Sequence, residues 1–218
     1  MNPFVVHSVP GSPFGRAVLA ALIEKNAPFR FVPVMPGTLK SESHLARHAF
    51  GRVPVLEHDG FDLYETAAIL RYIDRAQPTP TLTPADAKAA ARMDQVMNIA
   101  DWYLFQGVGN KIGFQRVVAP IVLGLAPDEA VCAAAMPQAR QVVKELSRLL
   151  DGGEWFAGTF SLADLIVYPH LDMLSMTPEW KELSALAPNV VAWLARGKQR
   201  RCFIETTTDR VLALASAA

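Results

Sequence analysis

The sequence of 218 residues has little of what defines several large protein classes. It holds two cysteines, Cys132 and Cys202, with no Cys-x-x-Cys spacing and no histidine cluster beside them. A disulfide scaffold and a structural zinc site are therefore not expected, and both thiols are predicted to be buried in a reducing compartment. The five histidines are dispersed as well, so we expect no bound metal ion.

Long apolar runs and an excess of charge of one sign are also missing. No apolar run approaches the roughly 18 residues of a membrane-spanning helix, and the N-terminus lacks the pattern of a signal peptide. The 21 basic residues balance the 21 acidic residues, which leaves no basic excess for binding nucleic acid. We expect a soluble, cytoplasmic protein that binds neither membrane nor nucleic acid. With 51% hydrophobic residues, the chain can bury a substantial core.

The hydrophobic pattern divides the chain into two halves. Before about residue 80, strand-like and helix-like runs follow the order β-α-β-α-β-β-α. This order predicts a parallel strand pair with an antiparallel hairpin added, as in thioredoxin-like α/β domains. The Pro/Thr segment 77–84 cannot continue a helix, and strand signals end beyond it. We predict a domain at 1–78, a linker at 79–84 and an all-α helical-bundle domain at 85–218.

Helices in the second half are predicted from capping signals and apolar spacing. Thr83 and Pro84, with Asp86, predict the first helix start, and the apolar face that follows is interrupted at Gly107-Val108-Gly109. Further helices are expected near 127–151, 161–176, 188–197 and 203–214. Ser161 and Asp164 have the spacing of a capping box, which stabilises a helix start.

The most informative stretch lies between residues 50 and 72. Two short apolar runs flank Asp59-Gly60, a strong hairpin signal, and Val53-Pro54 stands where the first run begins. Glu65-Thr66 then opens an apolar pattern with helical spacing. Proline at the mouth of a strand, a hairpin and an acid–hydroxyl pair at a helix start together predict polar groups around one crevice.

Taken together, Val53-Pro54, Glu65-Thr66, the linker and the Ser161–Asp164 box resemble the cytosolic glutathione S-transferase family over essentially the whole chain. The segment from His7 to Ser12, followed by Arg16, is similar to its serine-type classes, phi especially, in a bacterial form. Tyrosine-type classes would have tyrosine where His7 stands, and cysteine-type classes need cysteine at Ser12. The resemblance implies glutathione as co-substrate and a homodimer.

Ser12 is the catalytic residue that the resemblance implies. Ser12-Pro13 is also typical of a helix start, where free N–H groups and a partial positive charge favour an anion. A hydroxyl at that position could donate to the glutathione sulfur and favour the thiolate. Capping alone would also explain Ser12, and Ser8 is the alternative hydroxyl.

Six further residues are implied to bind glutathione. The backbone of Val53, exposed by a cis-Pro54, would pair with the cysteinyl part, with an ordinary edge-strand proline as the alternative. Thr66 and Glu65 would hold the γ-glutamyl end, with an ordinary helix cap and N-terminal acid as the alternative. Lys40 and Arg52 would meet the glycyl carboxylate or the peptide backbone of the ligand, with solvated surface charges as the equal alternative. His48-Ala49 replaces the Asn-Pro of many relatives, which changes the loop before Arg52.

The electrophile pocket and the dimer contact are implied less directly. Phe14 would line the pocket together with some of three residues from the helical half, which are Trp102, Gln106 and Phe114. Core packing or dimer contacts would explain most of the aromatic residues in this region. Phe50 resembles the aromatic key that some classes insert into a partner subunit, with core packing as the alternative.

The sequence therefore predicts a glutathione transferase that activates the thiolate for attack on a hydrophobic electrophile or a peroxide, in detoxification. One alternative is a glutathione-dependent dehalogenase, isomerase or peroxidase on the same fold. The other is a binding or interaction protein without turnover.

Overall fold

The computed structural model describes residues 2–216, and its contacts divide the chain into two compact units. The first unit contains the chain up to Leu82 together with the segment from Lys198 onward, and the second runs from Thr83 to Gly197. Each unit is described by itself.

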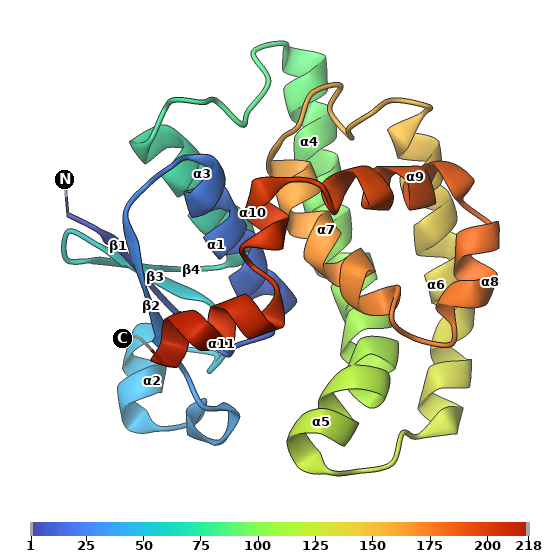
Figure 1. Ribbon diagram of the computed structural model, residues 1–218, viewed down its shortest axis with the longest axis horizontal. Helices are drawn as coiled ribbons and strands as arrows, with labels where there is room; N and C mark the ends of the chain where they lie inside the picture. Colours follow the sequence, from blue (N-terminus) through green and yellow to red (C-terminus); the bar gives the residue numbers. More distant parts are fainter. Residues whose placement is uncertain (1, 217–218) are drawn as a thin grey trace. The chain divides into compact units, whose positions relative to one another are not determined.

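The first unit is built on a four-stranded mixed sheet (Figure 1). Its strands are β1 (Phe4–Ser8), β2 (Phe29–Pro33), β3 (Val55–His58) and β4 (Phe61–Tyr64). Its helices are α1 (Pro13–Glu24), the short η1 (Pro36–Thr38), α2 (Glu42–Arg47), α3 (Thr66–Ala76), α10 (Arg201–Ile204) and α11 (Thr208–Ser216). The strand order is β2-β1-β3-β4, with β1 parallel to β2 and antiparallel to β3. This is the thioredoxin-like arrangement expected from the sequence, and the fold class is confirmed.

The core of this unit lies between the sheet and helices α1 and α3, which pack on each other. In the strand register Val6 pairs with Phe31 on one side and Leu56 on the other, and all three side chains are buried. The β3–β4 hairpin turns at Asp59 and Gly60, both with positive φ, as the Asp-Gly signal predicts.

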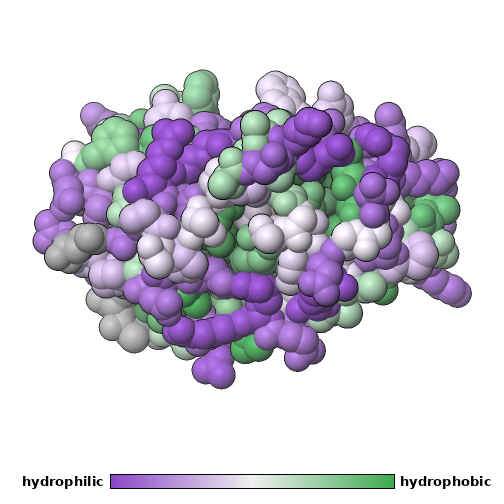
Figure 2. Space-filling view, turned by 90° about the horizontal axis from the view of Figure 1, so that it is seen from above, coloured by the Kyte–Doolittle hydropathy of each residue, from purple (hydrophilic) through white to green (hydrophobic). Residues whose placement is uncertain are grey.

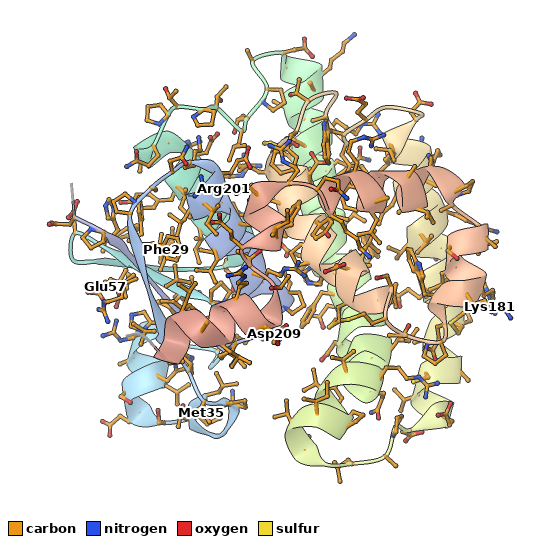
Figure 3. All side chains as sticks on the ribbon, viewed as in Figure 1. Phe29, Met35, Glu57, Lys181, Arg201 and Asp209 are labelled. Atoms are coloured by element: carbon orange, nitrogen blue, oxygen red, sulfur yellow. The ribbon has the colours of Figure 1, made fainter. Side chains whose placement is uncertain are left out.

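The C-terminal segment belongs to the first unit by its contacts, although the sequence placed it in a helical domain running to residue 218. The helix expected at 203–214 is divided into α10 and α11. Between them the buried Thr206 hydroxyl donates to the carbonyl of Cys202 at 2.7 Å, and Arg16 of α1 donates to the carbonyl of Phe203 at 3.2 Å. Arg201 of α10, labelled in Figure 3, also donates to Asn26 just beyond α1.

The second unit is all-helical. Its helices are α4 (Ala87–Ile99), η2 (Ala100–Val118), α5 (Ala119–Leu123), α6 (Glu129–Leu150), α7 (Leu162–Leu174), α8 (Trp180–Ala185) and α9 (Pro188–Gly197). Helix α7 lies at the centre, packed against α4, η2 and α9, and every residue from Leu162 to Leu171 is buried. The predicted capping box is confirmed, because Asp164 accepts the N–H of its N-cap residue Ser161.

Two details of this unit differ from the sequence prediction. Asp86 is itself the N-cap of α4 and accepts the N–H of Ala89 at 2.9 Å, so the helix begins after it and not at Thr83. The helix also continues through Gly107 as the π-helical η2. Gly107 is buried where a Cβ would lie 2.1 Å from the Gln138 side chain of α6, so this glycine permits close packing of two helices.

The surface is predominantly polar on the face shown in Figure 2, with scattered apolar residues between the hydrophilic side chains. No helix formed by residues 2–216 is long and apolar enough to cross a membrane.

Candidate functional site

The strand register brings three predicted segments to one end of the sheet. His7 of β1 pairs with Val55 of β3, and Val55 pairs with Tyr64 of β4. The turn after β1, the Val53-Pro54 pair before β3 and the Glu65-Thr66 pair after β4 therefore leave the sheet at the same end. The turn after β1 and the Val53-Pro54 pair are more than 40 positions apart in the sequence and meet there because β1 and β3 are antiparallel neighbours.

Ser12 is the N-cap of α1, and the two candidate hydroxyls have different surroundings. Ser12 Oγ accepts the N–H of Gly15 at 3.3 Å, and its side chain is half-buried. Because this bond uses a lone pair of the oxygen, the hydroxyl proton can still be donated to a ligand. Ser8 is fully buried beneath α1, where a Cβ at Gly15 would lie 2.1 Å from Ser8 Oγ.

The segment before β3 has its backbone turned by a cis peptide bond between Val53 and the buried Pro54. Within residues 2–216, neither the N–H nor the C=O of Val53 bonds to the rest of the backbone. The preceding carbonyl, of Arg52, accepts from His44 Nε2 at 2.8 Å. Val53 therefore offers a donor and an acceptor at the end of the sheet.

Glu65 and Thr66 form the start of α3. Glu65 is exposed and has φ +70° and ψ 112°, a backbone conformation that side-chain-bearing residues rarely adopt. Its side chain makes no capping hydrogen bond, so a helix cap does not explain it. Thr66 is the first residue of α3 and is buried, and its N–H is one of the donors that a helix leaves unpaired at its start. A carboxylate is the natural ligand for such donors.

The two cations expected at the glycyl end are both exposed. Lys40 Nζ donates to the carbonyl of Phe50 at 3.0 Å, so it lies against the loop before β3. Arg52 lies on the same loop. Lys40 is therefore brought to the loop that presents Val53.

The four residues expected at the electrophile pocket are not gathered by either unit. Phe14 belongs to the first unit, and the other three lie on η2 in the second. Trp102 is 70% exposed and lines a groove of about 710 Å³ between α4–η2 and α6. Gln106 is exposed, Phe114 is half-buried, and neither lines that groove.

Sequence reasoning missed an ionic cluster around His7. Arg47 donates to Glu57 Oε2 at 2.9 Å, and His7 Nε2 lies 3.4 Å from the same oxygen. Burial lowers the pKa of His7, although the hydrogen bond to Glu57 opposes that shift. The hydrogen bond to Arg47 contributes most to lowering the pKa of Glu57, the β3 residue labelled in Figure 3. Period-two alternation could have placed His7 and Glu57 on one face of neighbouring strands.

His44 and His48 were also missed as site residues, since the sequence shows only dispersed histidines. Both are buried, and both contact the loop that leads to Val53. Within residues 2–216, no three His, Cys, Asp or Glu side chains are grouped so that they could hold a metal ion.

Comparison with known proteins identifies the family of the chain. The family model for the glutathione S-transferase N-terminal domain matches residues 6–81, and that for the C-terminal domain matches residues 129–196. Glutathione S-transferase F7 of Arabidopsis thaliana is 31% identical over 194 residues, which cover 85% of this chain and 90% of that protein.

Two solved structures extend the comparison to the whole fold. Glutathione transferase F7 from Populus trichocarpa has a TM-score of 0.83 at 28% identity, covering 97% of this chain and 99% of that one. Glutathione S-transferase I from mais, in complex with an atrazine glutathione conjugate, has a TM-score of 0.80 at 27% identity and full coverage of both chains.

The thioredoxin-like sheet and the all-helical unit that follows it correspond to the two domains of glutathione transferases, whose family models match both parts of the chain. This chain belongs to the glutathione S-transferase family, with phi-like relatives at about 30% identity. It is a transferase, and its family uses glutathione as co-substrate.

Proposed function

We propose that Ser12 activates glutathione at the end of the sheet where the three segments meet. The tripeptide would pair with the backbone of Val53 beside Pro54, and its γ-glutamyl end would bind Glu65 and Thr66. Lys40 and Arg52 would attract the glycyl carboxylate. The Ser12 hydroxyl and the α1 N-terminus would then stabilise the sulfur as a thiolate.

The reaction that follows from this arrangement is nucleophilic attack by the thiolate. The sulfur forms a bond to an electrophilic carbon, and the leaving group departs with the electron pair of the broken bond. The protein supplies position and charge stabilisation, while the nucleophile belongs to the substrate. The atrazine conjugate bound by the relative from mais supports an aromatic, apolar electrophile. A peroxide, or the substrate of a dehalogenase or isomerase, would be an alternative target of the thiolate. A panel of these substrates distinguishes the alternatives.

The observation that supports this proposal most strongly is the state of the two serines. Ser12 is half-buried with a hydroxyl proton to donate, whereas Ser8 is enclosed beneath α1. The serine-type, bacterial assignment within the phi-like group depends on Ser12 and on the sequence pattern around it.

The first test is titration of the protein with reduced glutathione in a calorimeter, while thiolate absorbance is followed in a parallel sample. Saturable binding and a thiol that titrates below its free-solution pKa are expected. Absence of binding at millimolar glutathione would overturn the proposal.

Ser12→Ala should lower kcat about a hundredfold and leave the glutathione Kd within about twofold, because it removes a donor to developing charge and little binding surface. The thiol pKa in the complex should rise towards its free value. Asp86→Ala is the matched control, since Asp86 caps α4 with the same hydrogen bond to the third following residue. It should cost stability and leave kcat unchanged. Equal losses of kcat in both variants would show that Ser12 acts only as a helix cap.

We also propose a homodimer. Phe50 is 63% exposed on the loop before β3, and the groove on the second unit is lined by Trp102, Tyr103 and Val142 among others. An exposed phenyl ring and an apolar groove are complementary surfaces, and Phe50 of one copy would occupy the groove of a second copy. A cytoplasmic location is supported by both cysteines being free, buried thiols.

A further inference from the structure

The loop from His48 to Val53 connects α2 to β3 and presents the backbone that the proposed function assigns to glutathione. It contains no helix or strand, so its peptide groups are held by a backbone turn and by side chains. Two buried histidines contribute, His44 with 7% and His48 with 2% of the residue exposed.

His48 holds the first part of the loop. Its Nδ1 accepts the N–H of Phe50 at 3.3 Å, and its carbonyl accepts the N–H of Gly51 at 2.8 Å. Its ring stacks on Tyr64 of β4, with the ring centres 4.4 Å apart. The beginning of the loop is thus fixed to the last residue of the sheet.

His44 holds the end of the loop. Its Nε2 lies 2.8 Å from the carbonyl oxygen of Arg52. A carbonyl oxygen only accepts hydrogen bonds, so Nε2 bears the proton and donates it. Neutral and protonated forms of the ring can both make this bond.

The consequence for Val53 follows from the planarity of the peptide bond. The carbonyl of Arg52 and the N–H of Val53 belong to the same trans peptide unit, so they point in opposite directions. When the buried His44 holds the carbonyl inward, the N–H of Val53 is turned outward. Within residues 2–216 that N–H bonds to no backbone carbonyl.

We propose that His44 is a positioning residue for glutathione, which orients the Arg52–Val53 peptide so that the Val53 N–H meets the ligand. This inference depends on the proposed function. His44 would act on the ligand through the peptide plane of Arg52 and Val53. Loss of the imidazole should weaken the glutathione complex and leave the chemical step unchanged.

Two substitutions separate the hydrogen bond from simple packing. The amide nitrogen of Gln reaches about as far as Nε2 of His, whereas that of Asn is one methylene shorter. His44→Gln should therefore keep the glutathione Kd within about twofold. His44→Asn should raise it about tenfold, with kcat at saturating glutathione unchanged in both. His58→Gln is the matched control, because His58 is a buried histidine of β3 whose ring bonds to the Tyr72 hydroxyl at 2.8 Å. Its Kd should stay at the wild-type value.

The peptide can be followed without any ligand through the carbonyl ¹³C resonance of Arg52. It should move upfield in His44→Asn and return in His44→Gln, because a carbonyl that accepts a hydrogen bond is deshielded. If wild-type protein binds glutathione and both His44 variants bind equally well or equally poorly, the inference is overturned. If wild-type protein binds no glutathione although the Arg52 resonance responds, the proposed function is what fails.

Discussion

Glu65 has a backbone conformation that is unusual for a residue with a side chain. A non-glycine residue in its conformation costs about 1–3 kcal/mol, and such residues persist where function requires them. By contrast, Asp151 has φ 45° and ψ 43°, the left-handed region that Asp tolerates. The two residues share a positive φ and differ in strain.

Glu65→Gly should stabilise the ligand-free protein by about 1 kcal/mol and weaken glutathione binding, because it releases backbone strain and removes the carboxylate. Urea unfolding and calorimetric titration measure the two effects. Asp151→Gly is the control and should change the free energy of unfolding by only a few tenths of a kcal/mol. A destabilised Glu65→Gly variant would show that the backbone here is unstrained.

At the scale of elements, α7 contains two buried ionisable groups with opposite pKa shifts. Asp164 accepts hydrogen bonds from Phe156, Ser161 and Trp193, yet burial raises its pKa to about 6 from 3.8. Burial also lowers the pKa of His170 to about 4 from 6.5. Folded protein therefore holds the Asp164 proton more tightly, and the His170 proton more loosely, than unfolded protein.

These shifts predict opposing slopes of stability between pH 4 and pH 6. The contribution of Asp164 falls as pH rises through this window, and that of His170 is lost as pH falls through it, each on the order of 3 kcal/mol. Asp164→Asn should make the free energy of unfolding rise more steeply with pH than in wild type. His170→Leu should make the free energy of unfolding fall with rising pH relative to wild type. Urea unfolding at pH 4, 5 and 6 measures both, and curves parallel to wild type in both variants would contradict the assignment.

The prediction of elements from sequence succeeded where local chemistry defines an end. The start of α1 at Ser12-Pro13, the Asp59-Gly60 turn and the start of α7 at Ser161 are all determined by neighbours in sequence. The C-terminal helix was predicted as continuous, and the structure divides it at the buried Thr206. That break accompanies packing against α1, which no local pattern reports.

For the whole molecule, the proposed dimer is the testable consequence of exposed apolar side chains. Phe50→Glu places a charge where the groove of a second copy would bind the ring. It should weaken the dimer at least thirtyfold, as loss of a buried aromatic anchor does. Sedimentation equilibrium at several protein concentrations measures this. Met35→Glu is the control, because Met35 (Figure 3) is similarly exposed, at 65%, and takes no part in the proposed contact. Unchanged association in Phe50→Glu would refute this contact.

The sequence by itself determined the chemistry of each short segment. Ser12 before a proline, Val53 before Pro54 and Glu65 before Thr66 each predict a local backbone with free polar groups, and the family resemblance joined them into a glutathione site. Their roles stay predictions, whereas the family and the fold are established.

Only the tertiary structure decided which of these segments meet and what supports them. Antiparallel pairing of β1 with β3 brings Ser12 and Val53 to one end of the sheet, and the burial of Ser8 distinguishes the two candidate hydroxyls. The contact of His44 with the Arg52 carbonyl depends on how α2 folds back over its own loop. Such contacts depend on packing between elements, and a linear pattern of residue types contains no distance between them.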